Sequence, residues 1–145
     1  MSEFTKLVYA KAFAHTNDHE TALLLAAQAA LETGHGQHVP DNNLFGIKAH
    51  GASGGKTLTT KEVVKGKVVT EQASFRGYKD YDASIAGRIE FTVKNKRYAK
   101  HGYLAATTAE QKAAALQKAG YATDPKYAHK LVSIIATLRT ELSRA

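Results

Sequence analysis

The chain has 145 residues, no cysteine and a formal net charge of +7. That length is typical of one domain that folds without a covalent staple, and the lack of cysteine excludes disulfides and thiolate metal sites. The basic residues are spread along the sequence, so they indicate attraction to a polyanion without identifying one. The longest uncharged apolar run, residues 22–31, is shorter than the roughly 20 residues that cross a bilayer, so we expect no membrane insertion.

Two helices are predicted before residue 35. The first covers residues 4–14, and the second runs from about residue 18 to 33. Asn17 is expected to cap the second helix, with Glu20 completing a capping box. Gly34 suits the left-handed position that ends a helix. Apolar side chains in the second helix recur at the spacing of a buried stripe: Leu23, Ala26, Ala27, Ala30 and Leu31.

The middle of the chain changes in composition. Residues 48–56, KAHGASGGK, are rich in glycine and alanine and predict a flexible connection. The segments TLTTKEVV and KVVTEQASF that follow are rich in threonine and valine, and Lys65-Gly66 between them is a compact turn signal. We therefore predict a β-hairpin that forms a small lobe over about residues 56–76.

Helical patterns return after the hairpin. Asp80 or Asp82 is expected to cap a helix, and Thr108 with Gln111 forms a capping box for the next one, which Gly120 ends. Apolar positions expected in the first of these helices are Ile85, Ile89 and Val93.

Asp124-Pro125 is an N-cap and first-turn proline signature for a last helix. Its apolar stripe is expected to contain Leu131, Ile134, Ile135, Leu138 and Leu142. We predict a single, mostly helical α+β domain over residues 1–145, with a substrate cleft between two lobes.

Glu32 is the most informative candidate for chemistry. It is expected in the last turn of a helix that is otherwise apolar and rich in alanine. Desolvation and the negative end of the helix dipole both raise the pKa of a carboxyl in that place. An acid that keeps its proton near neutral pH is what a glycosidase needs to protonate a leaving oxygen. The alternative is an ordinary, solvent-exposed glutamate at a helix end.

Glycoside cleavage usually uses a second carboxylate, and the predicted hairpin offers Glu62 and Glu71. With a two-residue turn at Lys65-Gly66, Glu62 lies opposite Val69 and Glu71 is its diagonal neighbour on the same face. The residues alone leave both open as cleft residues or as ordinary solvated strand residues.

Four blocks, ALLLAAQAALETGHG, NNLFGIKAHG, SFRGYKDYDAS and GYATDPKYAHKL, resemble glycoside hydrolase family 73 in order and spacing. This family includes flagellar-rod-associated muralytic enzymes and autolysin catalytic domains, and the resemblance covers roughly residues 4–142. It implies a lysozyme-like, two-lobed α+β fold. It also implies hydrolysis of the β-1,4 linkage between N-acetylglucosamine and N-acetylmuramic acid in peptidoglycan, without a cofactor.

The resemblance also assigns roles to residues. It implies that Glu32 is the catalytic acid and that Glu62, in TTKEVVKGK, is the second carboxylate, with Glu71 as the alternative. Tyr121, which opens the last block, is implied to line the cleft near the acid. His35 stands where the family usually has tryptophan. The pKa of the nearby acid and the pH optimum of hydrolysis are expected to depend on that change.

Five further residues are expected to bind substrate. Asn43 and Phe45 belong to the loop after the catalytic helix, and Asn43 is expected to hydrogen-bond across the cleft floor. Arg76 is expected to hold a carboxylate, and Tyr78 to stack on sugar rings. Tyr127, in the last block, completes the set.

Other functions are weighed against this one. The histidine pairs His15/His19 and His35/His38 have no HExxH glutamate and no third ligand placed nearby, so no metal site is expected. A muramidase or lytic transglycosylase on the same fold is one alternative, and a non-catalytic wall-binding module is another. Nucleic-acid binding is not expected, because there is no helix-turn-helix or basic arm.

The N-terminus lacks the apolar core of a signal peptide. We therefore expect a monomeric phage endolysin, made in the host cytoplasm and acting on the cell wall after release. A virion-associated lysin and an excised domain of a secreted autolysin are the alternatives.

Overall fold

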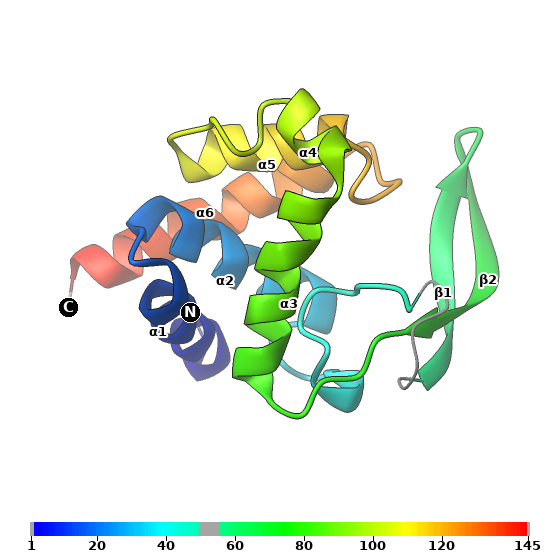
Figure 1. The fold of residues 1–145 in the computed structure, drawn as a ribbon, viewed down its shortest axis with the longest axis horizontal. Coiled ribbons are helices and arrows are strands. Elements are labelled where there is room, and N and C mark those ends of the chain that lie inside the picture. The colour runs from blue at the N-terminus through cyan, green and yellow to red at the C-terminus, as the bar shows by residue number, and fades with distance from the viewer. Residues whose placement is uncertain (1, 50–55, 145) are drawn as a thin grey trace.

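A computed structural model describes residues 2–49 and 56–144 of the chain, and the side chains of residues 56–59 and 71 lie outside this description. The described chain is mostly helical with one small antiparallel hairpin, which confirms the predicted α+β class (Figure 1). Its helices are α1 (Glu3–Thr16), α2 (His19–Thr33), η1 (Pro40–Asn42), α3 (Tyr81–Lys94), α4 (Lys96–Lys100), α5 (Ala109–Lys118) and α6 (Tyr127–Ser143).

Helix α2 forms the centre of the core. Every residue from 22 to 30 is buried, so this helix is enclosed on all sides and not only along the predicted stripe. It packs against α1, α5 and α6 (Figure 1). Its many alanines allow these neighbours to approach closely. No helix in the described ranges is both long enough and apolar enough to cross a bilayer.

The hairpin consists of β1 (Lys56–Val64) and β2 (Lys67–Phe75). Glu62 pairs with Val69, which confirms the predicted register. Lys65 and Gly66 have φ values of 51° and 79°, as the left-handed positions of a two-residue hairpin turn require. The predicted flexible connection over residues 48–56 falls largely on residues 50–55, outside the described residues.

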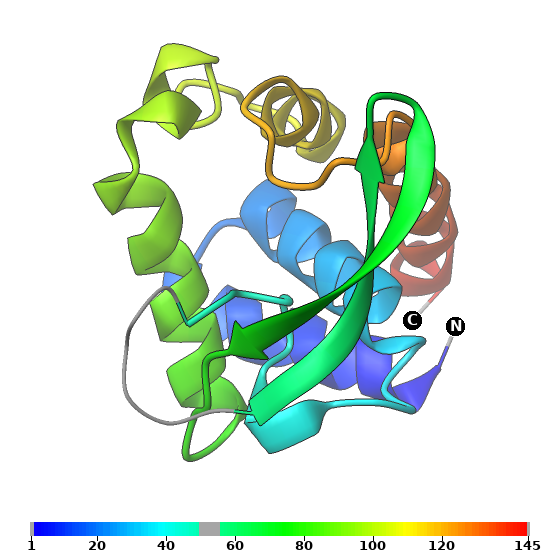
Figure 2. The same cartoon turned by 90° about the vertical axis from the view of Figure 1, so that its right-hand side faces the viewer.

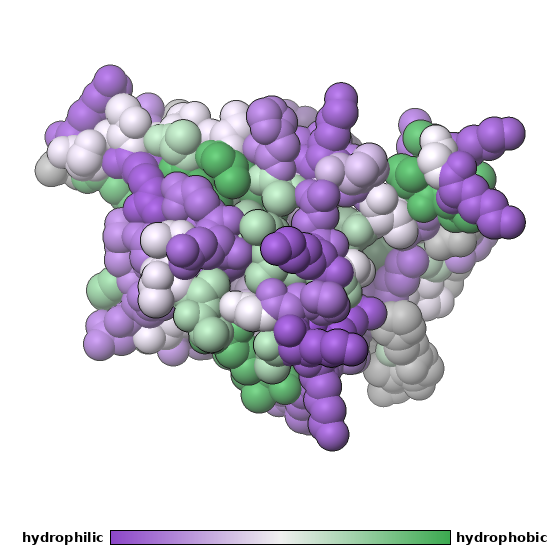
Figure 3. All heavy atoms as spheres, turned by 90° about the horizontal axis from the view of Figure 1, so that it is seen from above, coloured by the Kyte–Doolittle hydropathy of each residue, from purple (hydrophilic) through white to green (hydrophobic). Residues whose placement is uncertain are grey.

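The hairpin stands beside the helical body and crosses in front of α2 (Figure 2). No second sheet covers it in the described part of the chain, so Val64 and Val68 near its turn are 48% and 68% exposed. Figure 3 shows apolar atoms at this projecting end, between hydrophilic side chains.

Backbone hydrogen bonds fix the base of the hairpin to the loop after η1. Ala49 N donates to Ser74 O, and Arg76 N donates to Ile47 O. The buried side chain of Asn43 donates to the carbonyls of Ile47 and Arg76 at 2.8 and 3.0 Å. The loop and the hairpin therefore keep a fixed relation to each other at this end.

The prediction for the start of α2 is wrong in detail. Asn17 is the left-handed C-cap of α1, with φ of 49°, and Asp18 precedes the first residue of α2. Asparagine tolerates this conformation, so the signal attributed to a helix start belongs to a helix end. Glu20 makes no capping box, because its carboxylate accepts from Arg139 and from the backbone N–H of Ala109.

The later helices agree with the sequence except at two points. Asp80 caps α3, and Thr108 with Gln111 forms the predicted capping box of α5. The last helix, however, begins at Tyr127, because Asp124 caps a preceding turn by accepting from Lys126 N.

The other difference lies at the end of α3. Val93 is 60% exposed and not part of the core. The chain then bends at Asn95 and forms the short helix α4, which no pattern in the sequence predicted.

The capping role of Asn17 has a testable consequence for stability. Asn17→Gly is expected to leave the free energy of unfolding unchanged or slightly higher, because glycine adopts positive φ without strain. Asn17→Ser is expected to lower it by about 1 kcal/mol. Serine is as good an N-cap as asparagine, so equal stability of the serine variant in urea denaturation would restore the N-cap interpretation.

Candidate active site

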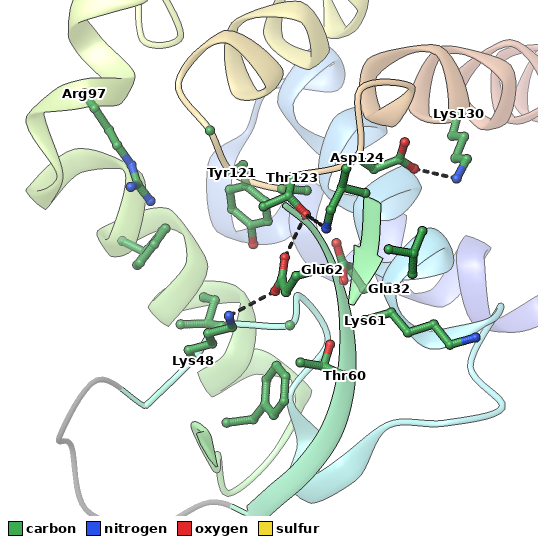
Figure 4. A pocket seen from close by; sticks show the side chains of 18 residues that line it. Glu32, Lys48, Thr60, Lys61, Glu62, Arg97, Tyr121, Thr123, Asp124 and Lys130 are labelled. Atoms are coloured by element: carbon green, nitrogen blue, oxygen red, sulfur yellow. Dashed lines mark hydrogen bonds and ion pairs between the residues drawn. The ribbon is translucent and has the colours of Figure 1, made fainter. Parts of the chain in front are cut away.

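A pocket of about 610 Å³ lies between the hairpin and the helical body (Figure 4). Its walls come from the end of α2, the loop after η1, both strands, the α3–α4 region and the loop between α5 and α6. Two carboxylates from distant parts of the chain, Glu32 and Glu62, face this space. The pocket is therefore bounded by the end of a helix on one side and by a strand of the hairpin on the other. The sequence predicts a cleft of this kind between the two lobes.

Glu32 occupies the last turn of α2. The residue as a whole is exposed and lines the pocket, whereas protein atoms crowd closely around its carboxyl group. This burial raises the pKa of Glu32 to about 7; a hydrogen bond from Tyr127 works in the lowering direction, and the charge of Glu62 raises the pKa further. A large fraction of Glu32 thus holds a proton at neutral pH, as predicted.

Glu62 has the opposite electrostatic environment. Lys48 Nζ donates to its Oε1 at 3.0 Å, and the Thr123 hydroxyl donates to its Oε2 at 2.8 Å (Figure 4). Partial burial works to raise the pKa of Glu62, but these two hydrogen bonds and the charge of Lys48 hold it below its ordinary value. At neutral pH, Glu32 is therefore protonated in a large fraction of molecules, whereas Glu62 is ionised.

Thr123 also joins the two walls of the pocket. Its hydroxyl accepts from the backbone N–H of Val63 at 2.8 Å while donating to Glu62. The loop between α5 and α6 thereby holds the free end of the hairpin, far from its base. The position of Glu62 depends on this contact as well as on the strand register.

A chain of hydrogen bonds leads from Glu32 into the core. The Tyr127 hydroxyl donates to Glu32 Oε1 at 3.2 Å and accepts from Gln28 Nε2 at 2.8 Å. Gln28 Oε1 in turn accepts from Arg88 Nε at 2.8 Å. Burial and the charge of Glu32 raise the pKa of Tyr127 well above its ordinary value, so its hydroxyl remains a donor to Glu32.

Arg88 is a fully buried cation. In the described part of the chain it forms no ion pair; its remaining donors bond to the hydroxyls of Thr92 and Tyr103, both at 3.0 Å. Its guanidinium also lies 5.3 Å from the ring centroid of Tyr103 and 5.5 Å from that of Tyr121. Neutral dipoles and aromatic rings therefore replace the water that this charge loses.

Tyr121 lies between this cluster and the pocket. Its ring lines the pocket and stacks on Tyr127 at 5.9 Å, and its hydroxyl donates to the carbonyl of Phe45 at 2.8 Å. Burial raises the pKa of Tyr121 far above its ordinary value, so it remains neutral. Tyr121 thus lies beside the acid, where the resemblance placed it, and ties the loop after η1 to the pocket wall.

Gly46 makes room for the acid. It has φ of +64°, and a Cβ at this position would lie 2.7 Å from Glu32 Oε2. Any larger residue would meet the carboxyl group itself. The glycine of the NNLFGIK block is therefore part of the site, although it carries no side chain.

The structure separates the five residues expected to bind substrate. Asn43 and Phe45 are buried, so direct contact with substrate does not fit their placement; they support the loop below the pocket. Neither Arg76 nor Tyr78 lines the pocket. Tyr127 reaches the site only through its hydroxyl on Glu32, which makes it a positioning residue.

Arg76 Nε and the Tyr78 hydroxyl are buried, and neither has a hydrogen-bond partner among the described residues. The ring of Tyr78 packs against Gly87, where a Cβ would lie 2.7 Å from it. The prediction that they bind substrate is explained by their place directly after the hairpin. At this point, however, the chain turns toward α3 and away from the pocket.

The sequence also names Glu71 and His35 as residues of interest. The side chain of Glu71 is outside the described residues, and only its backbone pairing with Thr60 is given. His35 is exposed, has φ of 57° and is not among the residues that line the pocket. The described residues contain no group of three or more side chains of the kinds that bind metal ions.

Sequence reasoning missed Gln28, Arg88, Lys48 and Thr123. Gln28 and Arg88 carried a signal, because each is a polar residue within an apolar helical pattern, and buried polar residues need partners. Lys48 and Thr123 are 14 and 61 residues from Glu62 along the chain, and no local pattern marks either one.

The chain is similar to known proteins over most of its length. Residues 8–140 match the family model Glucosaminidase, described as mannosyl-glycoprotein endo-beta-N-acetylglucosaminidase. The chain is 42% identical over 125 residues to the peptidoglycan hydrolase FlgJ of Salmonella typhimurium, covering 80% of this chain and 39% of the relative. It is 37% identical over 123 residues to the exo-glucosaminidase LytG of Bacillus subtilis, covering 81% and 44%.

Solved structures show the same fold. A peptidoglycan hydrolase mutant from Sphingomonas sp. A1 has a TM-score of 0.80 and 32% identity, with 98% of each chain covered. The glycoside hydrolase domain of Salmonella typhimurium FlgJ has a TM-score of 0.73 and 34% identity, covering 99% of this chain and 92% of that domain. The chain thus spans less than half of the curated relatives named above, and in FlgJ it corresponds to this domain.

The contact between Gly46 and Glu32 predicts a specific pattern of stability. Gly34→Ala, at φ of +59° with no heavy atom within 4 Å of the new Cβ, is expected to lower the free energy of unfolding by about 1–2 kcal/mol through backbone strain alone. Gly46→Ala is expected to lower it by at least ~1 kcal/mol more, because its Cβ meets the carboxyl group.

The excess loss tests the contact directly. In a Glu32→Ala background, Gly46→Ala is expected to have the same effect as Gly34→Ala, measured by chemical denaturation in a double-mutant cycle. An excess that persists without the carboxyl group would show that Gly46 is constrained by something other than Glu32.

Proposed function

Because the chain belongs to the glucosaminidase family, glycoside hydrolase family 73, we propose that it hydrolyses the glycan strands of peptidoglycan. The observation that carries the proposal is the pair of carboxyls in one pocket, one with a raised and one with a lowered pKa. A glycosidase uses such a difference between two pKa values to keep one carboxyl protonated as its acid and the other ionised as its anionic partner at neutral pH.

Glu32 is the general acid in this proposal. Its carboxyl accepts from Tyr127 through Oε1, which leaves Oε2 to carry the proton toward the pocket. Delivery of that proton to the glycosidic oxygen lets the leaving sugar depart as a neutral alcohol. Tyr121 and Tyr127, neutral and stacked, hold the carboxyl in a fixed orientation without competing for its proton.

Glu62 supplies the negative charge. As the glycosidic bond breaks, positive charge develops on the ring oxygen and anomeric carbon, and an ionised carboxylate near them lowers the energy of that state. Lys48 and Thr123 keep Glu62 ionised and hold it in place. This role is compatible with a retaining, an inverting or a substrate-assisted route, because each route either uses such a carboxylate directly or keeps it as an electrostatic partner.

The proposed fold is the lysozyme-like, two-lobed one, with the hairpin as the small lobe and the glycan strand lying across the pocket between the lobes. The proposed bond is the β-1,4 linkage between N-acetylglucosamine and N-acetylmuramic acid. Two names support this choice: one relative is an exo-glucosaminidase, and the matching family model is called Glucosaminidase.

Mass spectrometry of the fragments released from peptidoglycan tests the bond. Reducing-end N-acetylglucosamine supports the proposal, whereas reducing-end or anhydro-muramic acid indicates a muramidase or a lytic transglycosylase. The cell wall is the place of action in this proposal. None of the relatives named above is a phage protein, so an endolysin origin stays a prediction.

The role of Glu32 predicts opposite effects on activity and stability. Glu32→Gln is expected to reduce the rate of peptidoglycan hydrolysis by about 10²–10⁴-fold, because the proton donor is lost. Glu90→Gln, on an exposed residue of α3 outside the pocket, is the matched control and is expected to retain activity.

The stability of the same variant depends on pH. The pKa of Glu32 is higher in the folded protein than in the unfolded chain, so its contribution to stability is lost as pH rises from about 4.5 to about 7. Glu32→Gln cannot ionise, and its stability relative to the parent is therefore expected to increase between pH 4 and pH 8 in thermal denaturation. Undiminished hydrolysis by a folded Glu32→Gln protein would refute the assigned acid.

A further inference from the structure

Two of the cations that line the pocket have no acidic partner among the described residues. Four basic residues line the pocket: Lys48, Lys61, Arg97 and Lys130. Lys48 pairs with Glu62 at 3.0 Å, and Lys130 pairs with Asp124 at 2.5 Å. Arg97, from the short helix α4, and Lys61 have no acidic partner within the described residues, although Glu32, Glu62 and Asp124 also line the pocket.

Arg97 is nevertheless held in place. Its Nη2 donates to the Tyr98 hydroxyl at 2.8 Å, and its guanidinium carbon lies 4.9 Å from the centroid of the Tyr98 ring. Tyr98 itself is fully buried and packs against Phe91 and Tyr121. The guanidinium therefore rests on a rigid aromatic platform, and Figure 4 shows it directed from α4 toward the pocket.

This fixed position distinguishes Arg97 from Lys61. Both residues are exposed, but the side chain of Lys61, on β1, makes no hydrogen bond or ion pair with the described residues. A lysine on a flexible stem attracts anions without orienting them, whereas a guanidinium held by one N–H presents its remaining donors as a planar fork. Planar forks of this kind match carboxylates in a bidentate manner.

We propose that Arg97 forms a subsite that binds a carboxylate of the substrate at the α4 wall of the pocket. The inference rests on the proposed function, since it names the part of peptidoglycan that reaches this wall. Peptidoglycan carries carboxylates on the peptides attached to its muramic acid residues, and a lactyl carboxylate where the peptide has been removed. The peptide carboxylate is the expected ligand, so the subsite makes hydrolysis depend on the acidic peptide as well as on the sugar.

The test compares the purified full chain with Arg97→Gln on three substrates. The first is intact peptidoglycan, the second is the same material with its carboxylates converted to amides, and the third is peptide-free glycan with its lactyl carboxylate exposed. Lys100→Gln, an exposed residue of the same helix outside the pocket, is the matched control. Arg97→Lys tests the fork separately from the charge, and thermal denaturation checks the packing on Tyr98.

On intact peptidoglycan, Arg97→Gln is expected to lower kcat/KM by about tenfold, the effect of one charge-assisted bidentate contact. Arg97→Lys is expected to recover only part of that loss, and Lys100→Gln is expected to match the parent. On the amidated material, the parent is expected to fall to the level of Arg97→Gln.

A defect on intact peptidoglycan that is absent from the amidated and the peptide-free material supports the peptide carboxylate. A defect on peptide-free glycan, where the lactyl carboxylate is exposed, supports a subsite that accepts that carboxylate. An equal defect on amidated and intact material, or no defect at all, would overturn the subsite. A parent protein that cuts none of the three substrates would overturn the proposed function, and the subsite with it.

Discussion

The burial of Arg88 is the constraint on which the rest of the site depends. A cation enclosed in the centre of a small domain is unstable without polar partners, and here Gln28, Thr92 and Tyr103 each accept a hydrogen bond from the guanidinium. Because Gln28 has one amide group, accepting from Arg88 through oxygen leaves its nitrogen to donate to Tyr127. The hydroxyl of Tyr127 is then directed at Glu32. The orientation of the acid is thus fixed from the core outward.

The same arrangement explains how one pocket holds two differently charged carboxyls. Glu32 comes from the end of the central helix, where protein crowds its carboxyl and its hydrogen-bond donor among the described residues, Tyr127, is neutral. Glu62 comes from a hairpin that is open to solvent and reaches a lysine and a hydroxyl. The two-stranded hairpin has little packing of its own, so its contact with Thr123 is important for bringing the second carboxyl to the first.

The sequence predicts those parts of the molecule whose signals are local. Periodicity and capping residues identified α2, the capping box of α5 and the hairpin register, because each depends on residues a few positions apart. Asn17 was misassigned because the same residue type caps both ends of helices. Helix α4 was missed because five residues are too few for a periodic pattern.

For the site, the sequence predicts the two carboxyls and Tyr121 but not what holds them. Glu32 was marked by its place at the end of an apolar helix, and Glu62 by strand register together with family resemblance. The long-range contacts of Lys48 and Thr123 are set by tertiary packing, which no single segment encodes. Asn43 and Phe45 are buried beside the site, which fits residues that fix the loop after the catalytic helix and not residues that contact substrate.

The central claim is that the two carboxyls of the pocket hold different charges at neutral pH. It is tested most directly by NMR titration of the carboxyl carbons in protein labelled at glutamate, with Glu32→Gln and Glu62→Gln used for assignment. We expect the Glu32 signal to titrate with a pKa of about 7 and the Glu62 signal to titrate below the ordinary value of 4.5. Titration of Glu32 at or below that ordinary value would contradict the claim.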